Sequence, residues 1–322
     1  MKKIFSFIAL AFLSVSAFAQ TCVETDVNLT GTASITFTRY EHKNLTGLFS
    51  VAAGKQVLFS QGNLQYQAST NTWRFAENQW DALQRDGGNE TSSNRETQSK
   101  WIDMFGWGTS GWDSGATEYQ PWTRSLTNTD YAPGGSYTSD LTGAYAQADW
   151  AWYNPIINGG QDMNGPSANQ WRVLTLAEWS YFLARKDADE NLLYCFGSLM
   201  GTNGVYFLPD EWDWSSIDGG DFEDNWVGGS KVFTTVTISS ATGAELWETL
   251  ENAGVIFLPL TGVRNANSLV IRYSAAKGYY WSSTHYGAKG ASSYTLYFES
   301  GSIGVPNTSR SSGCAVRAVR DL

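Results

Sequence analysis

Aromatic side chains constrain this chain more than any other feature. Tryptophan occurs fifteen times, tyrosine sixteen times and phenylalanine sixteen times among 322 residues. Aromatic rings bury large areas and also form rigid amphipathic contact surfaces. Charged residues make up only 16% of the chain, compared with about a quarter in an average soluble domain. The composition therefore predicts a β-rich module with a large aromatic core, an aromatic recognition face, or both.

The N-terminus has the pattern of a secretory signal peptide. Lys2 and Lys3 precede the apolar run 4–15, and Ala17 and Ala19 form a small-x-small cleavage site. The run is shorter than the roughly 20 residues that a membrane-spanning helix needs. We therefore predict a signal peptide over residues 1–19 and no membrane insertion. The mature protein is expected to be secreted, periplasmic or at the cell surface.

The charge balance argues against a nucleic-acid partner. The formal net charge of −10 becomes −12 when the two lysines of the signal peptide are removed. No basic patch stands out that would neutralise phosphates. The three cysteines do not have the spacing of a zinc site. In an oxidising compartment one pair among Cys22, Cys195 and Cys314 is open to disulfide formation, and the alternative is that they are small apolar residues in strands.

The mature chain is expected to consist of an N-terminal strand or arm over residues 20–44 and a single domain over residues 45–322. Apolar and polar residues alternate from Val27 to Thr38, which predicts a half-buried strand. Such a strand lies at the edge of the main domain, precedes it as an arm, or pairs with the sheet of another protein.

Two helices are expected in the main domain. Thr175 and Glu178 form a capping box for the first, and Thr242 and Glu245 form one for the second. Gly254 is a natural C-terminal stop for the second helix. Two apolar runs, 204–209 and 254–259, have related sequences that end in proline and predict two buried strands. Further strands are expected over residues 56–60, 63–67, 278–283, 293–299 and 314–319.

Three sequence motifs resemble those of FISUMP-type and related secreted bacterial domains. They span 171–179 (WRVLTLAEW), 280–284 (YWSST) and 315–320 (AVRAVR), in the same order as in that family. The resemblance covers roughly residues 45 to 321, with Leu174 in place of the usual proline. It implies a C-type lectin-like fold of the α+β class, with two helices, small twisted antiparallel sheets and extensive ordered loops.

The resemblance also suggests where a ligand would bind. The same fold carries diversified binding surfaces near the C-terminus in target proteins of diversity-generating retroelements. The corresponding region here, residues 282–312, is rich in Tyr, Ser and Asn, the adaptable residues of antibody paratopes. We expect a glycan or protein ligand to contact residues in and next to this region, namely Trp281, His285, Tyr286, Tyr294, Tyr297, Asn307 and Arg310.

No catalytic constellation is evident from the sequence. His42 and His285 are the only histidines, and no nucleophile-elbow motif accompanies them, although a triad through His285 is an alternative. Formylglycine-generating enzymes share the fold, but their activity depends on a closely spaced cysteine pair near the C-terminus, where this chain has Cys314 alone. The adjacent carboxylates Asp210 and Glu211 would point to different sides of a strand, so they do not suggest a glycosidase.

We expect no cofactor and no metal, with calcium as the alternative. The acidic run that includes Asp213, Asp218 and Asp221 supplies the oxygen ligands that calcium prefers. The spacing is not that of an EF-hand, and the sugar-binding motifs of C-type lectins are missing. A solvated acidic loop with tryptophans packed underneath is the favoured interpretation.

Six tryptophans in long irregular stretches either form a sugar-stacking platform or fill the core. They are Trp101, Trp107, Trp112, Trp122, Trp150 and Trp152. We expect most of them in the core. A concave cluster of exposed rings would favour a carbohydrate ligand, and a flat face of Tyr, Ser and Asn would favour a protein.

Export, the motif set and the missing catalytic constellation together predict a non-catalytic ligand-binding or adhesion module. One alternative is a secreted hydrolase that acts on polysaccharide or protein. Another is a structural subunit of a surface assembly, docked through its N-terminal strand.

Overall fold

The structure is a computed structural model. It describes residues 25–29, 33–37, 45–90, 94–112, 119–135, 137–162, 165–217, 219–239, 243–266, 270–288 and 290–322. The expected signal peptide and His42 lie outside these residues. The chain forms two compact units, which divide between Asn44 and Leu45. No helix among the described residues is long and apolar enough to cross a membrane.

The N-terminal unit contains a hairpin rather than the single strand expected over residues 27–38. Strand β1 (Thr25–Leu29) pairs antiparallel with β2 (Ala33–Phe37). The register places Val27 opposite Ile35. The single-strand prediction was wrong because the period-two pattern continues through both strands, so alternation alone carried no sign of the reversal.

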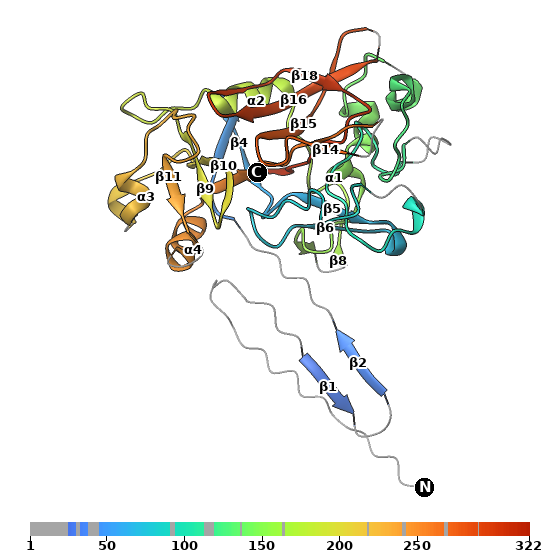
Figure 1. Ribbon diagram of the computed structural model, residues 1–322, viewed down its shortest axis with the longest axis horizontal. Helices are drawn as coiled ribbons and strands as arrows, with labels where there is room; N and C mark the ends of the chain where they lie inside the picture. The colour runs from blue at the N-terminus through green and yellow to red at the C-terminus, as the bar shows by residue number, and fades with distance from the viewer. Residues whose placement is uncertain are drawn as a thin grey trace. The chain divides into compact units, whose positions relative to one another are not determined.

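The larger unit belongs to the α+β class, as the sequence predicted, with small and mostly antiparallel sheets (Figure 1). One four-stranded sheet has the order β11–β9–β10–β12. Strands β10 and β12 confirm that the two related apolar runs are buried strands, and the two strands are neighbours, with Gly204 opposite Pro259. The bounds of this sheet are β9 Tyr194–Leu199, β10 Thr202–Phe207, β11 Val236–Ile238 and β12 Ile256–Pro259.

A second four-stranded sheet carries the C-terminal hairpin. It is built on β15 and β16, and β17 and β18 pair with different stretches of β16. A register shift between Trp281 and His285 marks a bulge in the hairpin. The strand bounds are β15 Lys277–Tyr286, β16 Ser292–Glu299, β17 Ser302–Gly304 and β18 Asn307–Ser309.

The remaining strands form smaller sheets around these two. A three-stranded sheet joins the ends of the unit in the order β19–β4–β3, from Val319–Asp321, Lys55–Phe59 and Phe49–Ala52. The two-stranded pairs are β5 Leu64–Gln67 with β6 Thr72–Phe75, β7 Gln161–Asp162 with β8 Gly165–Pro166, and β13 Val263–Arg264 with β14 Ile271–Arg272.

The two expected helices are present, and two one-turn helices accompany them. The α-helices are α1 Trp150–Tyr153, α2 Leu176–Leu183, α3 Gly220–Asp224 and α4 Ala244–Asn252. Short 3-10 turns occur at η1 Ala68–Thr70, η2 Arg95–Thr97, η4 Asn128–Tyr131, η5 Pro133–Gly135, η6 Gly143–Ala148 and η7 Trp214–Ser216.

The first predicted capping box is confirmed, whereas Thr242 of the second lies outside the described residues. Both hydrogen bonds of the box between Thr175 and Glu178 are present at the start of α2. The N-cap of α4 is Gly243, one residue later than predicted, and no side chain caps this helix. Gly254 follows α4 with a φ of 97°, a left-handed conformation that favours glycine, so the predicted stop is confirmed.

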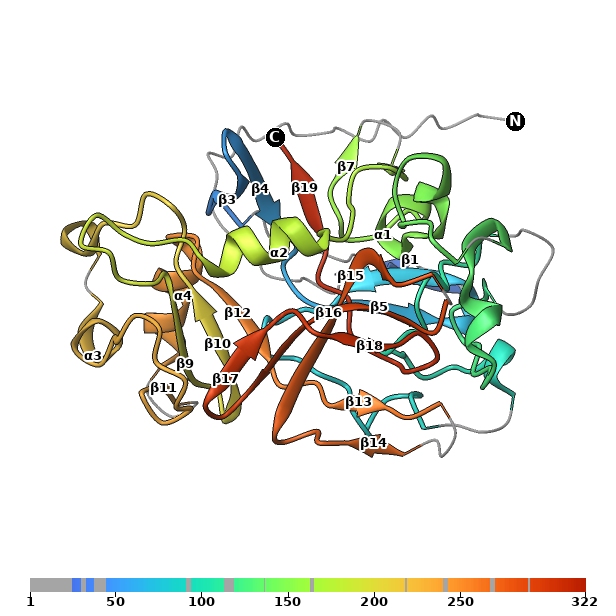
Figure 2. The same cartoon turned by 90° about the horizontal axis from the view of Figure 1, so that it is seen from above.

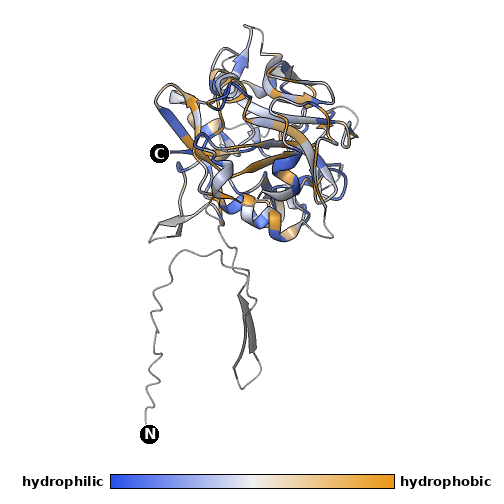
Figure 3. Ribbon diagram, turned by 90° about the vertical axis from the view of Figure 1, so that its left-hand side faces the viewer, coloured by the Kyte–Doolittle hydropathy of each residue, from blue (hydrophilic) through white to orange (hydrophobic). Residues whose placement is uncertain are grey.

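The core of the larger unit contains three apolar clusters of described residues. The first joins α2 to β3, β4 and the two four-stranded sheets. The second lies under the irregular segments between β6 and α2, and the third lies between the β9–β12 sheet and helices α3 and α4. Apolar residues follow the inner strands in Figure 3, and α2 lies between β4 and β15 in Figure 2.

Indole N–H groups attach the irregular segments to this core. Trp107 donates to the carbonyl of Ser282 at 2.9 Å, and Trp281 donates to the carbonyl of Phe105 at 2.7 Å. Trp171 donates to the carbonyl of Gly159 at 2.7 Å. A buried carbonyl without a donor costs free energy. Each of these tryptophans therefore fills volume and also fixes an irregular segment through a backbone carbonyl.

A charged network joins the start of α2 to strands β19 and β4 of the three-stranded sheet. The Arg172 guanidinium contacts Glu178 at 2.8 Å and Asp321 at 2.6 Å. Lys55 contacts the same Glu178 carboxylate at 2.9 Å. Burial raises the pKa of Glu178, but hydrogen bonds from Arg172, Thr175 and Lys55 outweigh burial and hold that pKa below its usual range.

We expect Glu178→Gln to lower the free energy of unfolding by about 2 kcal/mol at neutral pH, because it removes the negative charge that pairs with Arg172 and Lys55, although Gln can keep the capping box. The folded pKa of Glu178 is depressed. Its stabilisation is therefore present above the unfolded pKa of about 4.3 and is lost as the pH falls through the folded value.

Urea titrations between about pH 6 and pH 3 would measure both effects, and the variant should show the shallower pH dependence. Glu190→Gln is the matched control, because its exposed pair with Lys186 contributes about 0.5 kcal/mol or less. Equal losses for the two variants would contradict the role of the network.

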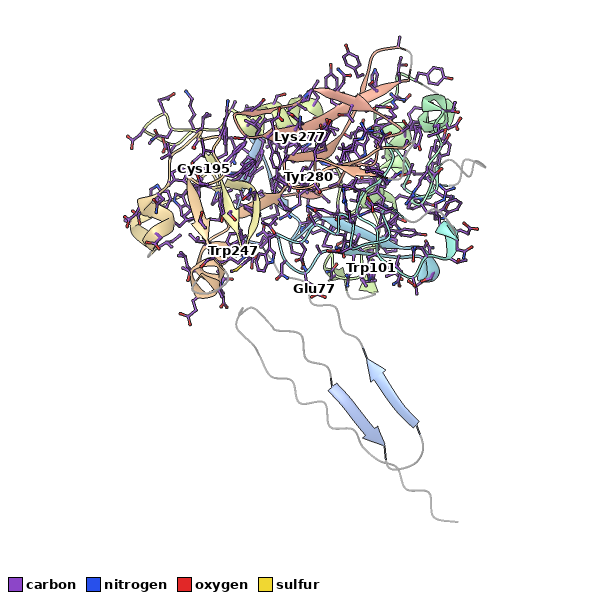
Figure 4. All side chains as sticks on the ribbon, viewed as in Figure 1. Glu77, Trp101, Cys195, Trp247, Lys277 and Tyr280 are labelled. Carbon is purple, nitrogen blue, oxygen red and sulfur yellow. The ribbon has the colours of Figure 1, made fainter. Side chains whose placement is uncertain are left out.

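Two of the three cysteines are buried free thiols. Cys195 lies in β9 within the third cluster, and Cys314 lies in the second cluster. Figure 4 labels Cys195 and Trp247 on the α3–α4 side of the unit. Burial raises the pKa of Cys195 to about 11 and raises the pKa of Cys314 further. A disulfide between these two is excluded, and Cys22 lies outside the described residues.

A thiol reagent at neutral pH should therefore modify neither buried cysteine in the native Cys22→Ser chain and both after unfolding, because the thiolate is the reactive form. Counting modified cysteines by mass spectrometry before and after addition of guanidinium checks this. Rapid native modification of Cys314 would place it outside the core.

Candidate binding face

The turn end of the β15–β16 hairpin, where β18 pairs with β16, exposes a face of Tyr, Ser and Asn side chains. Tyr286 lies opposite Ser292, Ser292 lies opposite Ser309, and Tyr294 lies opposite Asn307. Directly opposed residues and alternate residues of one strand share a face of the sheet. We call Tyr286, Ser292, Tyr294, Asn307 and Ser309 the tyrosine face.

All five residues of the tyrosine face are exposed or half-buried. Tyr286 is 45% exposed, and its ring meets the Tyr294 ring edge-on with centroids 5.3 Å apart. Neither phenolic hydroxyl, nor the side-chain amide of Asn307, has a hydrogen-bond partner among the described residues. These rings and polar groups are therefore available to a ligand on a sheet that already fixes their positions.

The opposite side of the same strands is packed against an irregular segment through Arg310. This arginine is fully buried, with its guanidinium 4.2 Å from the Trp107 ring. It donates to the Ser293 hydroxyl at 2.9 Å and to the carbonyls of Tyr131 at 3.1 Å and Tyr137 at 3.0 Å. Burial lowers the pKa of Arg310 to about 10, and the charge of Asp140 partly opposes this.

A carboxylate–histidine pair also joins the hairpin to this irregular segment; we call this contact the junction. Asp140 accepts a hydrogen bond from the backbone N–H of His285 at 2.9 Å and lies 2.6 Å from its Nδ1. In Figure 1 the segment that carries η6 lies beside the tip of this hairpin. Among the described residues no hydroxyl or thiol group is bonded to the His285 ring. The pair therefore lacks the nucleophile that a triad requires.

The structure divides the predicted site residues into three groups. Tyr286, Tyr294 and Asn307 lie together on the tyrosine face, and His285 lies on the opposite side next to Asp140. The predicted placement of Trp281, Arg310 and Tyr297 in the binding site was wrong. Trp281 and Arg310 are fully buried, because the large apolar ring and the guanidinium fill the core under the hairpin.

Tyr297 lies at the other end of β16, away from the tyrosine face. Its ring packs against Tyr279 with centroids 5.1 Å apart, and its hydroxyl accepts a hydrogen bond from Lys277 at 2.9 Å. Lys277 also contacts Glu299 at 2.8 Å, and Figure 4 labels it near the start of β15. This cluster already holds its own cation against its rings, so Tyr297 is not part of the same surface.

Two residues of the junction were not anticipated from the sequence. Asp140 is 145 residues from His285 along the chain. Tyr137 is 37% exposed, and its ring leaves no room for a side chain at Gly290, where an added Cβ would lie 2.3 Å from the ring. Both lie in an irregular segment without periodicity, so no local pattern marked them as neighbours of the hairpin.

The acidic run forms an exposed loop over aromatic rings, as the sequence favoured. Asp213 accepts hydrogen bonds from the backbone and hydroxyl of Ser215, while Trp212 and Trp214 pack edge-on below it with centroids 5.1 Å apart. No group of three or more His, Cys, Asp or Glu residues that could hold a metal occurs among the described residues. Asp221 lies in α3 and Asp218 lies outside the described residues, so calcium binding stays a prediction.

The tryptophans do not form an exposed platform. All fifteen are buried or half-buried, and Trp107 and Trp150 of the six candidates are fully buried. Asp210 is likewise structural, because it accepts hydrogen bonds from Ser50 and Gln56 and pairs with Arg185 at 2.9 Å. The accessible rings near the C-terminal hairpin are tyrosines.

Comparison with known proteins adds one finding. A family described as a domain of unknown function, DUF8237, matches residues 226–319. No curated protein and no solved structure matches the chain. The matched segment contains the tyrosine face, but it separates β11 and β12 from the strands β9 and β10 with which they pair. Its boundaries therefore cut through a sheet.

We expect Arg310→Met to lower the free energy of unfolding by about 2–4 kcal/mol, because it removes the donors to the buried carbonyl of Tyr131 and the part-buried carbonyl of Tyr137. Asn307→Ala, on the opposite side of the same sheet, should change it by about 0.5 kcal/mol or less. Guanidinium unfolding curves for the two variants measure the difference. Equal effects would contradict the division of the hairpin into a packed side and a free side.

Proposed function

We propose that this protein is a non-catalytic, exported binding module whose tyrosine face contacts a protein surface. The observation that carries the proposal is the pair Tyr286 and Tyr294, which are accessible, in mutual contact and without partners for their hydroxyls. Tyrosine provides a large rigid contact area at a low cost in conformational entropy. Asn307 and Ser292 add adaptable hydrogen-bonding groups around the rings.

Rigidity of the supporting strands favours binding. Arg310 and the Asp140–His285 pair hold the packed side of the hairpin in one position. A surface that is already ordered loses little entropy when a partner docks. The support therefore lowers the cost of association without contacting the ligand.

A protein ligand is favoured over a glycan. Sugar platforms depend on exposed aromatic rings arranged in a concave cluster, and no tryptophan of this chain is fully exposed. The tyrosine face is instead a sheet surface of mixed polar and aromatic side chains. Such surfaces match the composition of protein-binding paratopes.

We also propose that the chain is a FISUMP-type protein with a C-type lectin-like fold. The three motifs that carry the resemblance lie against one another. Arg172 of the first forms a bridge with Val319 of the third, and Tyr280 of the second forms one with Ala315 of the third. The backbone N–H of Ser283 donates to the carbonyl of Leu174 at 3.0 Å. This mutual contact supports a single structural signature.

The His285–Asp140 pair is the observation that favours the rival function, a secreted hydrolase. A carboxylate fixes the ring tautomer and orientation, as in the triads of hydrolases. The pair has no bonded hydroxyl among the described residues. The rival therefore needs a nucleophile from water or from a substrate-induced rearrangement.

We expect the double variant Tyr286→Ala, Tyr294→Ala to bind a protein ligand at least about tenfold more weakly than the native chain, because aromatic anchors dominate interface energies. Arrays of extracellular proteins and of glycans, probed at micromolar concentration, identify the ligand, and titration calorimetry then measures the affinity. Tyr181→Ala is the matched control, since Tyr181 is an exposed ring on α2.

Equal affinities of the double variant and the native chain for the identified ligand would contradict the tyrosine face as the site. The absence of binding on both the protein array and the glycan array would contradict the binding function. Turnover of a polysaccharide or protein substrate that disappears in His285→Ala would replace the proposal with the hydrolase.

A further inference from the structure

A small cavity beside the β13–β14 hairpin is lined by three arginines. Arg95, Arg124 and Arg264 converge on it, together with Asn89, Gln98 and Trp122 among its lining residues. Arg264 belongs to β13, Arg95 begins η2, and Arg124 lies in the irregular segment between them in the chain. The cavity is separate from the tyrosine face, because no residue of that face lines it.

Arg264 is a buried charge without a partner. It is only 2% exposed, and its side chain makes no hydrogen bond or ion pair with any described residue. Its Nη1 is buried and unsatisfied. The backbone of Arg264 is fixed by two hydrogen bonds with Gly313, at 2.9 and 2.8 Å. A Cβ on Gly313 would lie 2.6 Å from the Arg264 Nε, so the guanidinium is packed closely against this strand.

Arg124 supplies a second unsatisfied donor to the same cavity. Its Nη2 donates to the carbonyls of Asn89 and Gly88, while its Nη1 is buried without a partner. Burial and the positive charges of Arg264 and Arg95 lower the pKa of Arg124 to about 9. The backbone carbonyls therefore orient the guanidinium and leave its Nη1 donor without a hydrogen-bond partner.

Glu90, whose charge acts on Arg124, makes its own contacts with other residues. Glu90 accepts a hydrogen bond from the backbone N–H of Ile271 at 2.9 Å and lies 3.7 Å from the Nε of Arg85. None of the described carboxylates forms an ion pair with any of the three cavity arginines. The cavity therefore concentrates positive charge that the described part of the chain does not neutralise.

Other buried arginines of this chain show how a guanidinium is normally satisfied. Arg310 has hydrogen bonds to carbonyls and a hydroxyl on two segments, and Arg185 pairs with Asp210 at 2.9 Å. Arg317 also has unsatisfied nitrogens, but it donates to Gln79 at 2.6 Å and does not line this cavity. Arg264 is thus unusual in having neither a counterion nor a hydrogen bond of its side chain.

The chemistry of the guanidinium group indicates what kind of partner Arg264 and Arg124 would bind. Arginine stays protonated in proteins, so burial cannot be relieved by loss of the proton. A buried charge is tolerated when it is paired and hydrogen-bonded. Two guanidinium N–H edges in one cavity match the acceptor geometry of a carboxylate or a tetrahedral oxoanion. We propose that this cavity is a binding site for a small anion, held between Arg264 and Arg124.

The size of the cavity limits the ligand. It offers about 20 Å³ to the centre of a water-sized sphere, where about 10–15 Å³ admits one water molecule. A free small anion, or the charged end group of a longer molecule, fits this space. A nucleotide or a sugar ring does not fit inside it.

The test is thermal unfolding of the full chain in dilute Hepes with added acetate or phosphate, against chloride at the same ionic strength. We expect at least one of the two anions to raise the Tm saturably by about 2 °C or more over chloride, because a ligand of the native state stabilises it by mass action. The two titrations distinguish a carboxylate ligand from an oxoanion. Titration calorimetry on the native chain measures the binding directly.

Arg264→Met should abolish this shift and remain folded in anion-free buffer, since it removes an unpaired buried charge. Arg124→Gln, at a half-buried position, should weaken the shift and serves as the second variant. Arg272→Gln on the exposed side of β14 removes the same charge and should leave the shift intact. Equal Tm values for the native chain in all three salts, with no calorimetric signal, would overturn the proposal, as would an unchanged shift in Arg264→Met.

Discussion

Hydrogen bonds from buried indoles to backbone carbonyls, which fix the irregular segments, are the interaction on which the rest of this structure depends. Regular strands and helices satisfy their own backbone, but irregular segments need outside donors. Trp107 and Trp281 donate across the same interface in opposite directions, to Ser282 and Phe105. They join the irregular segment after β6 to the C-terminal hairpin. The aromatic composition is therefore the means by which a chain with little regular structure acquires a fixed interior.

This fixed interior gives the C-terminal hairpin two different sides. Arg310 holds its inner side against the segment that precedes α1, and the outer side is left to Tyr286, Tyr294 and Asn307. The arginine cavity uses the same construction, because Gly313 and the β13–β14 pair hold Arg264 from behind. At the hairpin and at the arginine cavity alike, close packing on one side holds polar groups in fixed positions on the other side.

Several features that depend on spacing along the chain could be predicted from the sequence. The spatial relations between distant residues could not. The capping box of Thr175 and Glu178, the paired apolar runs and the α+β class follow from spacing along the chain, so they could be predicted from the sequence. Composition near the hairpin indicated a binding region but carried no information about which way each side chain points. Arg310 and Trp281 were therefore assigned to the surface. Asp140 was missed because its proximity to His285 depends on the path of an irregular segment.

The separation of the two sides has a consequence for how this protein could be altered. The positions of the tyrosine face lie on strands whose backbone is secured from beneath, so their side chains can vary without disturbing the interior. Randomising these five positions would generate a repertoire of surfaces on one constant framework. The exposed tyrosine face and the packed interior thus depend on different residues of the same three strands, β15, β16 and β18.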